Sequence, residues 1–120
     1  MLNWEANLSA SKAPNRLAVY GSLAPGRPNH HHLADISGTW RHGWVEGVLY
    51  DRGWGAVQGY PGIRLEGGGP RVEVHVLESA ELARHWDRLD DFEGEEYCRV
   101  SVEIHGLDTG PVAGWIYALK

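Results

Sequence analysis

The sequence predicts an α+β domain: a small, barrel-like, strongly curved sheet, mostly antiparallel or mixed, with one main helix packed on it. Three observations support this prediction. About five or six short strand-like segments are separated by turns, many of them formed around the chain's 16 glycines. Only one segment has the apolar periodicity of a substantial helix. A regular alternation of strands and helices is absent, which argues against a doubly wound parallel sheet.

Length and composition fit a single globular domain. The chain has 120 residues, 42% hydrophobic and 22% charged. A formal net charge of −5, with Lys and Arg scattered singly, argues against a nucleic-acid partner. No apolar run approaches the ~18 residues of a membrane span, and no signal-peptide pattern is present. We therefore expect a cytoplasmic protein without a membrane partner, whose single cysteine, Cys98, forms no intrachain disulfide.

The chain is expected to divide into an N-terminal extension, residues 1–16, and one domain, residues 17–120. The extension is mixed in composition and rich in turn residues. The segment from Arg16 to Tyr20 is apolar and is stopped by Gly21, so it predicts a first, buried strand.

A loop containing Pro-Gly follows this strand, and Asn29 is expected to cap a short helical turn over residues 30–33. The turn contains His30, His31 and His32, which with Asp35 raise the alternative of a divalent metal site. Successive side chains point in different directions, however, which is poor ligand geometry. We therefore expect no metal site and a solvated loop or short helix.

Alternating apolar residues predict most of the remaining strands. Gly47, within one of them, indicates a bulge or a close approach of another backbone segment. Most of the six tryptophans are expected to fill the core. The predicted strands cover residues 36–50, 63–65, 71–77, 97–104 and 112–119.

The main helix is expected to begin at Ser79, whose hydroxyl can cap it. At about 100° per residue, Leu82, Trp86 and Leu89 form one apolar stripe, and Glu93 falls near its middle. A buried charge costs several kcal/mol unless it is paired or its pKa rises. A carboxyl with a raised pKa is a candidate general acid and base near neutral pH. The alternative is a helix whose last turn frays at the following glycine, leaving Glu93 in solvent.

Two aspartates of the same segment are weaker candidates. Asp91 falls on the polar side of the helix, and Asp90 lies at the edge of the apolar stripe. Arg99, on the strand after the helix, is expected to form an ion pair with Asp90, although it could instead hold a substrate carboxylate. Cys98 has no adjacent base in the sequence and is expected to serve packing.

The strand exit Tyr20-Gly21-Ser22-Leu23 is the second candidate site. Gly21 permits close approach or an unusual backbone conformation, so the N–H groups around it could converge on an oxygen anion. The alternative is an ordinary strand exit. A phosphate-binding loop is excluded, because the required glycine pattern and lysine are missing.

Several short motifs occur together in a fixed order: Val19 to Leu23, Asn29, the turn Tyr60-Pro61-Gly62, and Leu89 to Gly94 with Tyr97 and Arg99 beyond it. In this order the sequence resembles the gamma-glutamylcyclotransferase-like superfamily. The resemblance is nearest to its small branch, which includes gamma-glutamylamine cyclotransferases and avirulence-induced proteins, and it extends from about Leu17 to Leu119.

The resemblance implies a barrel-like sheet with helices against it and a cavity between them. It also implies an intramolecular reaction, in which the α-amine of a gamma-glutamyl group attacks its own side-chain amide and releases 5-oxoproline and an amine or amino acid. The family's catalytic glutamate corresponds to Glu93, and its substrate-binding loop corresponds to Tyr20, Gly21, Ser22 and Leu23. The chemistry requires no metal, no cofactor and no covalent enzyme intermediate.

Two tyrosines and two loops are further candidates for contact with a substrate. Tyr97 and Tyr117 are expected to bind substrate or to contact Glu93, with a core position as the alternative. The leaving group is expected to meet residues 52–59 or 67–70, which are rich in glycine. Two other functions compete with the cyclotransferase: a non-catalytic protein that binds small molecules on the same fold, and a metal-dependent hydrolase that uses the histidine loop.

Overall fold

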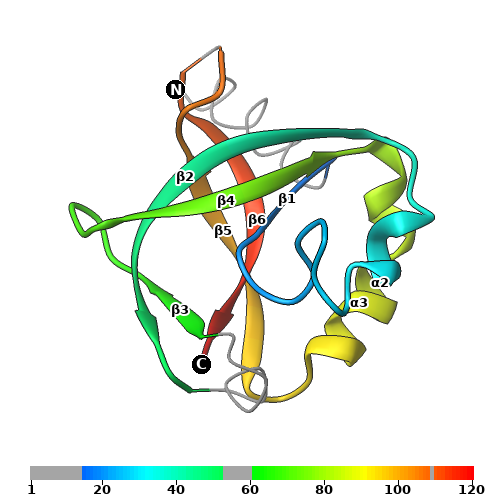
Figure 1. Cartoon of the computed structure of the whole chain (residues 1–120), viewed down its shortest axis with the longest axis horizontal. Helices are drawn as coiled ribbons and strands as arrows, with labels where there is room; N and C mark the ends of the chain where they lie inside the picture. Colours follow the sequence, from blue (N-terminus) through cyan, green and yellow to red (C-terminus); the bar gives the residue numbers. More distant parts are fainter. Residues whose placement is uncertain (1–14, 53–60, 109) are drawn as a thin grey trace, which may run out of the picture.

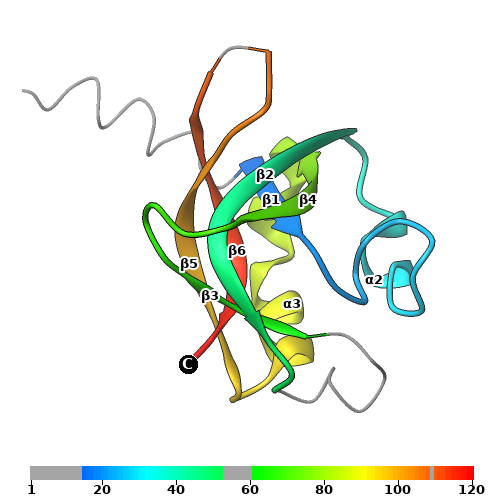
Figure 2. The ribbon, with the colours of Figure 1, turned by 60° about the vertical axis from the view of Figure 1, so that its left-hand side comes forward.

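The computed structural model describes residues 15–52, 61–108 and 110–120. Its six strands form one sheet in the order β3-β2-β4-β1-β6-β5, which curls around itself while the helices lie on one side (Figures 1 and 2). The strands are β1 (Arg16–Val19), β2 (Thr39–Tyr50), β3 (Gly62–Leu65), β4 (Arg71–Glu78), β5 (Tyr97–Ile104) and β6 (Val112–Leu119), and the helices are α2 (His31–Ala34), η3 (Ala80–Arg84) and α3 (Trp86–Glu93).

The sheet is mixed and nearly closed. β1 pairs parallel with β6 and antiparallel with β4, and the other neighbouring pairs are antiparallel. An antiparallel bridge between Trp44 of β2 and His105, just after β5, joins the two halves of the sheet. This arrangement confirms the predicted barrel-like α+β fold with one main helix.

The core has two parts, one on each face of the sheet, as the alternating strand patterns predict. One lies between the sheet and the helices and includes Leu33, Leu82 and Leu89, all fully buried. The other is enclosed by the barrel and contains buried residues from all six strands: Ala18, Val45, Ile63, Val72, Val74, Val76, Ile104, Ile116 and Ala118.

The expected single helix from Ser79 to Glu93 is divided in two. Ser79 is its cap as predicted, since the Ser79 Oγ accepts a hydrogen bond from the Glu81 N–H at 3.1 Å. The first part is the 3-10 helix η3, because the N–H groups of Leu82 and His85 bond three residues back. The backbone of His85, at φ −115° and ψ −2°, then separates η3 from α3. The apolar stripe is nevertheless preserved, because Leu82, Trp86 and Leu89 are all buried.

The predicted cap of the short helix is wrong. The N-cap of α2 is His30, which makes no side-chain capping bond. The Asn29 side chain instead donates from Nδ2 to the Ser22 Oγ at 2.9 Å, because the chain folds back on the loop after β1. Gly47, in contrast, has the expected role, since a Cβ there would lie 2.7 Å from the Arg64 carbonyl oxygen on β3.

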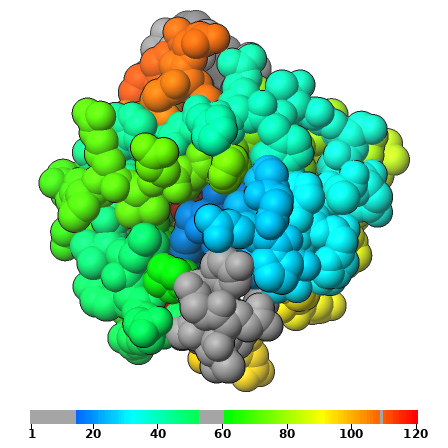
Figure 3. Space-filling model, in the orientation of Figure 1, coloured from blue at the N-terminus to red at the C-terminus, as the bar shows by residue number. Residues whose placement is uncertain are grey.

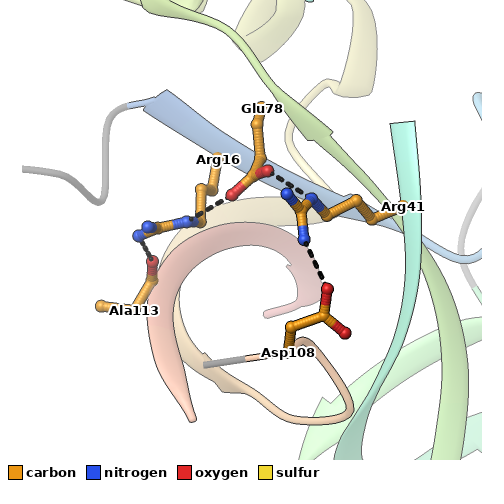
Figure 4. Close-up of polar contacts among 5 residues, drawn as sticks. All are labelled: Arg16, Arg41, Glu78, Asp108 and Ala113. Atoms are coloured by element: carbon orange, nitrogen blue, oxygen red, sulfur yellow. Dashed lines mark hydrogen bonds and ion pairs between the residues drawn. The ribbon is translucent and has the colours of Figure 1, made fainter. Parts of the chain in front are cut away.

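A cluster of charged side chains ties the strands together at the start of β6 (Figure 4). Glu78 accepts from Arg16 Nε at 3.0 Å and pairs with Arg41 Nε at 2.8 Å. Arg16 also donates to the Ala113 carbonyl at 3.0 Å, and Arg41 NH1 lies 3.7 Å from an oxygen of the exposed Asp108. The Glu78 cluster therefore joins β1, β2, β4 and β6.

None of the helices in the described parts of the chain is long and apolar enough to cross a membrane.

Candidate active site

Helix α3 places Glu93 at its end, beside the sheet. Glu93 is the last helical residue, and its side chain is buried, with 8% exposure. Gly94 stops the helix at φ 80°, a conformation that side chains rarely adopt, while its N–H still bonds the Asp90 carbonyl at 3.0 Å. The helix thus ends without fraying, and the alternative of a solvent-exposed Glu93 is wrong.

Burial changes the acidity of this carboxyl. Removal from water disfavours the charged form and raises the pKa of Glu93 to about 7. Near neutral pH, such a carboxyl can both accept and donate a proton. The raised pKa expected from the position of Glu93 on the apolar stripe therefore follows from its place in the structure.

Glu93 shares a cavity with the strand exit after β1. The space has an empty volume of about 410 Å³, which includes its open mouth, and the loop reaches the molecular surface beside β3 (Figure 3). The walls are formed by Ala18, Val19, Tyr20, Gly21, Ser22, Leu23, Pro61, Glu93, Tyr97 and Tyr117. The structure therefore brings together all seven residues that the sequence singled out for catalysis or substrate binding.

The loop after β1 is a hydrogen-bonded turn and more than a simple strand exit. The Ala24 N–H donates to the Gly21 carbonyl at 3.0 Å, which closes the turn. Asn29 approaches from the other end of the loop, and its backbone N–H donates to the Ser22 carbonyl at 2.9 Å. The Ser22 side chain is buried, at 8% exposure. The turn therefore has a defined backbone where it lines the cavity.

The hydroxyl of Tyr20, the residue that follows β1, links strands β6 and β3. It donates to the Tyr117 carbonyl of β6 at 2.8 Å and accepts from the Ile63 N–H of β3 at 3.0 Å. Burial is the main cause that raises the pKa of this phenol, so Tyr20 stays protonated. Because its hydroxyl is already engaged on both sides, Tyr20 contributes its ring and its backbone to the cavity wall.

Asp90, one turn before Glu93, organises a second set of polar contacts, which we name the Asp90 network. Arg99 donates to both of its carboxylate oxygens, from Nε at 2.9 Å and from NH2 at 3.3 Å, and Tyr117 donates its hydroxyl at 2.7 Å. The Arg99 guanidinium also lies over the rings of Trp86 and Trp115, 4.4 and 4.9 Å from their centres. The expected Asp90–Arg99 ion pair is confirmed.

The network makes two carboxyls of α3, those of Asp90 and Glu93, chemically different. Partial burial alone would raise the pKa of Asp90, but the hydrogen bonds from Arg99 and Tyr117 and the charge of Arg99 outweigh it and lower the pKa. Burial and the bond to Asp90 both raise the pKa of Tyr117, which therefore remains protonated. Asp90 is accordingly a charged anchor, and Glu93 is the carboxyl suited to proton transfer.

Two histidines of the loop after β1, His30 and His32, pack against aromatic rings. The His32 ring packs against Phe92 at 4.0 Å between centres, and His30 lies against Trp40 at 5.3 Å. Within residues 15–52, 61–108 and 110–120, no three or more His, Cys, Asp or Glu side chains are grouped to hold a metal. Cys98 is half-buried and is not a wall residue of the cavity.

Two parts of the wall were not assigned from the sequence. Pro61 lines the cavity, although the sequence marked it only as part of a turn motif, and Ala18 and Val19 line it from β1.

The first region proposed for the leaving group, residues 52–59, lies largely outside the described residues, which resume at Pro61. The second, residues 67–70, is not part of the described wall.

The family model described as "Gamma-glutamyl cyclotransferase, AIG2-like" matches residues 17–120. The chain belongs to this family. Solved structures with the same fold include YkqA from Bacillus subtilis, with 26% identity and a TM-score of 0.67 over 88% of this chain and 36% of that one. An AIG2-like protein from Mus musculus has 27% identity and a TM-score of 0.67, over 87% of this chain and 76% of the mouse chain.

An uncharacterized protein from Pyrococcus horikoshii is also similar, with 25% identity and a TM-score of 0.59 over 88% of this chain and 79% of that one. This chain thus spans about a third of YkqA but most of the mouse and Pyrococcus proteins. No curated protein matches the sequence.

Proposed function

We propose that the protein is a cofactor-free gamma-glutamyl cyclotransferase in which Glu93 is the general acid and base. The observation that carries the proposal is the position of Glu93: a buried carboxyl with a pKa of about 7 shares a cavity with the backbone of Gly21, Ser22 and Leu23. Membership of the cyclotransferase family supports the same reaction. The substrate is a small molecule that carries a gamma-glutamyl group.

In the proposed first step, Glu93 in its carboxylate form removes a proton from the substrate's α-ammonium group. The neutral amine then attacks the carbonyl carbon of the side-chain amide, and a C–N bond forms to close the five-membered ring. Because both reacting groups belong to one molecule, the cavity has only to hold the reactive rotamer. The carbonyl oxygen becomes an oxyanion, which N–H groups of the Gly21–Leu23 turn stabilise.

In the second step the bond between this carbon and the amide nitrogen breaks. Protonated Glu93 returns its proton to the departing nitrogen, which leaves as an amine or amino acid, and the carbonyl re-forms. The ring nitrogen gives its second proton to the Glu93 carboxylate, which passes it to the released amine, so that 5-oxoproline is formed and Glu93 is again ionised. One carboxyl thus serves as base and then as acid, which a pKa near 7 permits in both directions. Tyr97 and Tyr117 enclose the substrate from the β5 and β6 side.

The test is release of 5-oxoproline from a panel of gamma-glutamyl amines and gamma-glutamyl peptides. Glu93→Gln keeps the shape of the side chain but removes its proton chemistry, so kcat should fall by about 10² or more. Asp91→Asn is the matched control, because Asp91 is an exposed carboxylate of the same helix; it should leave kcat unchanged. Full turnover by Glu93→Gln on an accepted substrate would refute the role of Glu93.

The competing function is a binding protein that keeps the cavity but does not turn over its ligand. Calorimetry with the same panel distinguishes the two. Binding of gamma-glutamyl compounds without release of 5-oxoproline would favour the binding protein, whereas product formation that depends on Glu93 supports the cyclotransferase.

A further inference from the structure

Each carbonyl of the turn after β1 is held by a residue outside the cavity wall. The Gly21 carbonyl accepts the Ala24 N–H at 3.0 Å, and the Ser22 carbonyl accepts the Asn29 N–H at 2.9 Å. The Leu23 carbonyl oxygen lies 3.0 Å from the Nδ1 of His30. Ala24, Asn29 and His30 are not among the cavity-lining residues, whereas Gly21, Ser22 and Leu23 are. All three carbonyls are therefore engaged by partners that do not line the cavity.

Peptide geometry then fixes the direction of the N–H groups. A trans peptide is planar, so its C=O and N–H point in opposite directions, and the described chain has no cis peptide bond. The bond to the Gly21 carbonyl therefore also fixes the direction of the Ser22 N–H, and the bond to the Ser22 carbonyl fixes that of the Leu23 N–H. The anchors of the carbonyls thus determine which donors an oxyanion in the cavity would meet.

His30 completes this set of anchors. Because a carbonyl oxygen only accepts, the Nδ1 of His30 must carry a hydrogen. That bond fixes the Leu23–Ala24 peptide, whose N–H in turn holds the Gly21 carbonyl. The imidazole itself lies against the Trp40 ring, with 5.3 Å between centres. Asn29 adds a second contact from its side chain to the Ser22 Oγ at 2.9 Å.

We propose that His30 and Asn29 are positioning residues, which hold the turn so that the N–H groups of Ser22 and Leu23 form the oxyanion site. The catalytic part of this inference rests on the proposed cyclotransferase function. The histidine run therefore contributes a backbone anchor to the active site, and the donor on Nδ1 is the part of His30 that matters for catalysis.

Two substitutions at His30 separate the donor from the ring. His30→Phe keeps a ring to pack on Trp40 but removes the donor, whereas His30→Asn keeps a donor near the position of Nδ1 and removes the ring. We expect kcat for 5-oxoproline release to fall about tenfold or more in His30→Phe, with KM changed less than about threefold, because the donors act mainly on the transition state. We expect His30→Asn to recover kcat to within about threefold of the wild type.

The matched control is His31→Phe. His31 also has its Nδ1 3.1 Å from a backbone carbonyl, that of Pro28, but this contact is exposed and outside the turn. Its substitution should leave kcat unchanged. Wild-type kcat in His30→Phe, or equal loss in His30→Phe and His30→Asn, would overturn the proposal, since the donor would then be irrelevant.

Crystal structures of the wild type and His30→Phe provide a readout that does not depend on turnover. The proposal requires the Leu23–Ala24 peptide to change orientation in His30→Phe, and an unchanged turn would overturn it. If the wild type releases no 5-oxoproline from any substrate, the proposed function fails, while the peptide orientation still decides whether His30 positions the turn. If His30→Phe does not fold, His30→Leu, which also lacks the donor, takes its place with the same expected fall in kcat. Asn29→Ala keeps the backbone N–H on the Ser22 carbonyl and removes only the side-chain bond to the Ser22 Oγ, so kcat should fall several-fold at unchanged KM. An unchanged kcat in both variants would overturn the proposal.

Discussion

Two polar clusters lie near opposite ends of β6, and they differ in what they contact. The Glu78 cluster, at Ala113, joins strands and involves the Arg41 side chain at 43% exposure and Asp108 at 94% (Figure 4). The Asp90 network, at Tyr117, lies beside the cavity, and its arginine is stacked against two tryptophans. Similar ion pairs thus join strands of the barrel at one end of β6 and lie beside the candidate active site at the other.

Arg99 is paired within the Asp90 network and is not among the residues that line the cavity of Glu93. Arg99 is engaged by both oxygens of Asp90, so its charge is largely compensated within the network. Burial is accordingly the cause that sets the raised pKa of Glu93. Pairing of Arg99 with Asp90 is therefore compatible with a carboxyl at Glu93 whose pKa is raised by burial.

Asp90→Asn should have the largest effect, because it leaves the charge of Arg99 uncompensated beside Tyr117, which lines the same cavity as Glu93. We expect the pKa of Glu93 to fall, which moves the acidic limb of the kcat/KM profile to lower pH, and we expect kcat to decrease as the acid form is lost. The half-buried Arg99 also loses its partner, which costs about 1–2 kcal/mol of unfolding free energy. A pH–rate profile and denaturant unfolding measure both effects. An acidic limb that stays in place would show that the network does not influence Glu93.

Tyr117→Phe should have a smaller effect, because it removes one donor to Asp90 and leaves the Arg99 pair intact. The free energy of unfolding should decrease by about 1 kcal/mol, and kcat should fall by only a few-fold. The Tyr117 carbonyl still receives the Tyr20 hydroxyl, so the barrel contact is retained. A loss of activity as large as that of Glu93→Gln would instead give the Tyr117 hydroxyl a direct chemical role.

Glu78→Gln is the corresponding change in the other cluster and should affect stability alone. It weakens the bonds to Arg16 and Arg41, so the free energy of unfolding should decrease by about 0.5–1 kcal/mol, with less effect at high salt. The activity and its pH profile should be those of the wild type, because the cluster does not line the cavity. A shifted pH profile would contradict the separation of the two clusters.

Asp108→Asn should have the smallest effect. Its carboxylate is 94% exposed and lies 3.7 Å from Arg41, a distance and exposure at which ion pairs rarely contribute measurable stability. Unfolding and turnover should both match the wild type. A clear loss of stability would mean that the β5–β6 connection depends on this contact.

Local sequence patterns predict the parts of the site that depend on periodicity. Spacing along the predicted helix places Glu93 on one stripe with Leu82, Trp86 and Leu89, and the structure buries all four. Strand alternation likewise predicts β5 and β6 with their observed bounds. These features are predictable because a helix or strand repeats its side-chain directions at a fixed interval.

The features that sequence patterns miss depend on contacts between distant segments. Asparagine is a common helix-capping residue, but the side chain of Asn29 donates its hydrogen bond to the hydroxyl of Ser22, seven residues away. The Tyr20 hydroxyl bonds groups 43 and 97 residues along the chain, which no local pattern specifies. The break at His85 interrupts the helix but not its apolar stripe, so periodicity alone predicts one continuous helix.

The most direct test of the account is the titration of the Glu93 carboxyl, followed by its side-chain carboxyl ¹³C NMR signal and assigned by comparison with Glu93→Gln. We expect a midpoint near 7, whereas an exposed glutamate titrates near 4.5. Because the folded protein then binds this proton more tightly than the unfolded chain, stability should decrease as pH rises from about 4.5 to about 7, relative to Glu93→Gln. A midpoint near 4.5, with no such pH-dependent difference, would contradict Glu93 as the general acid and base.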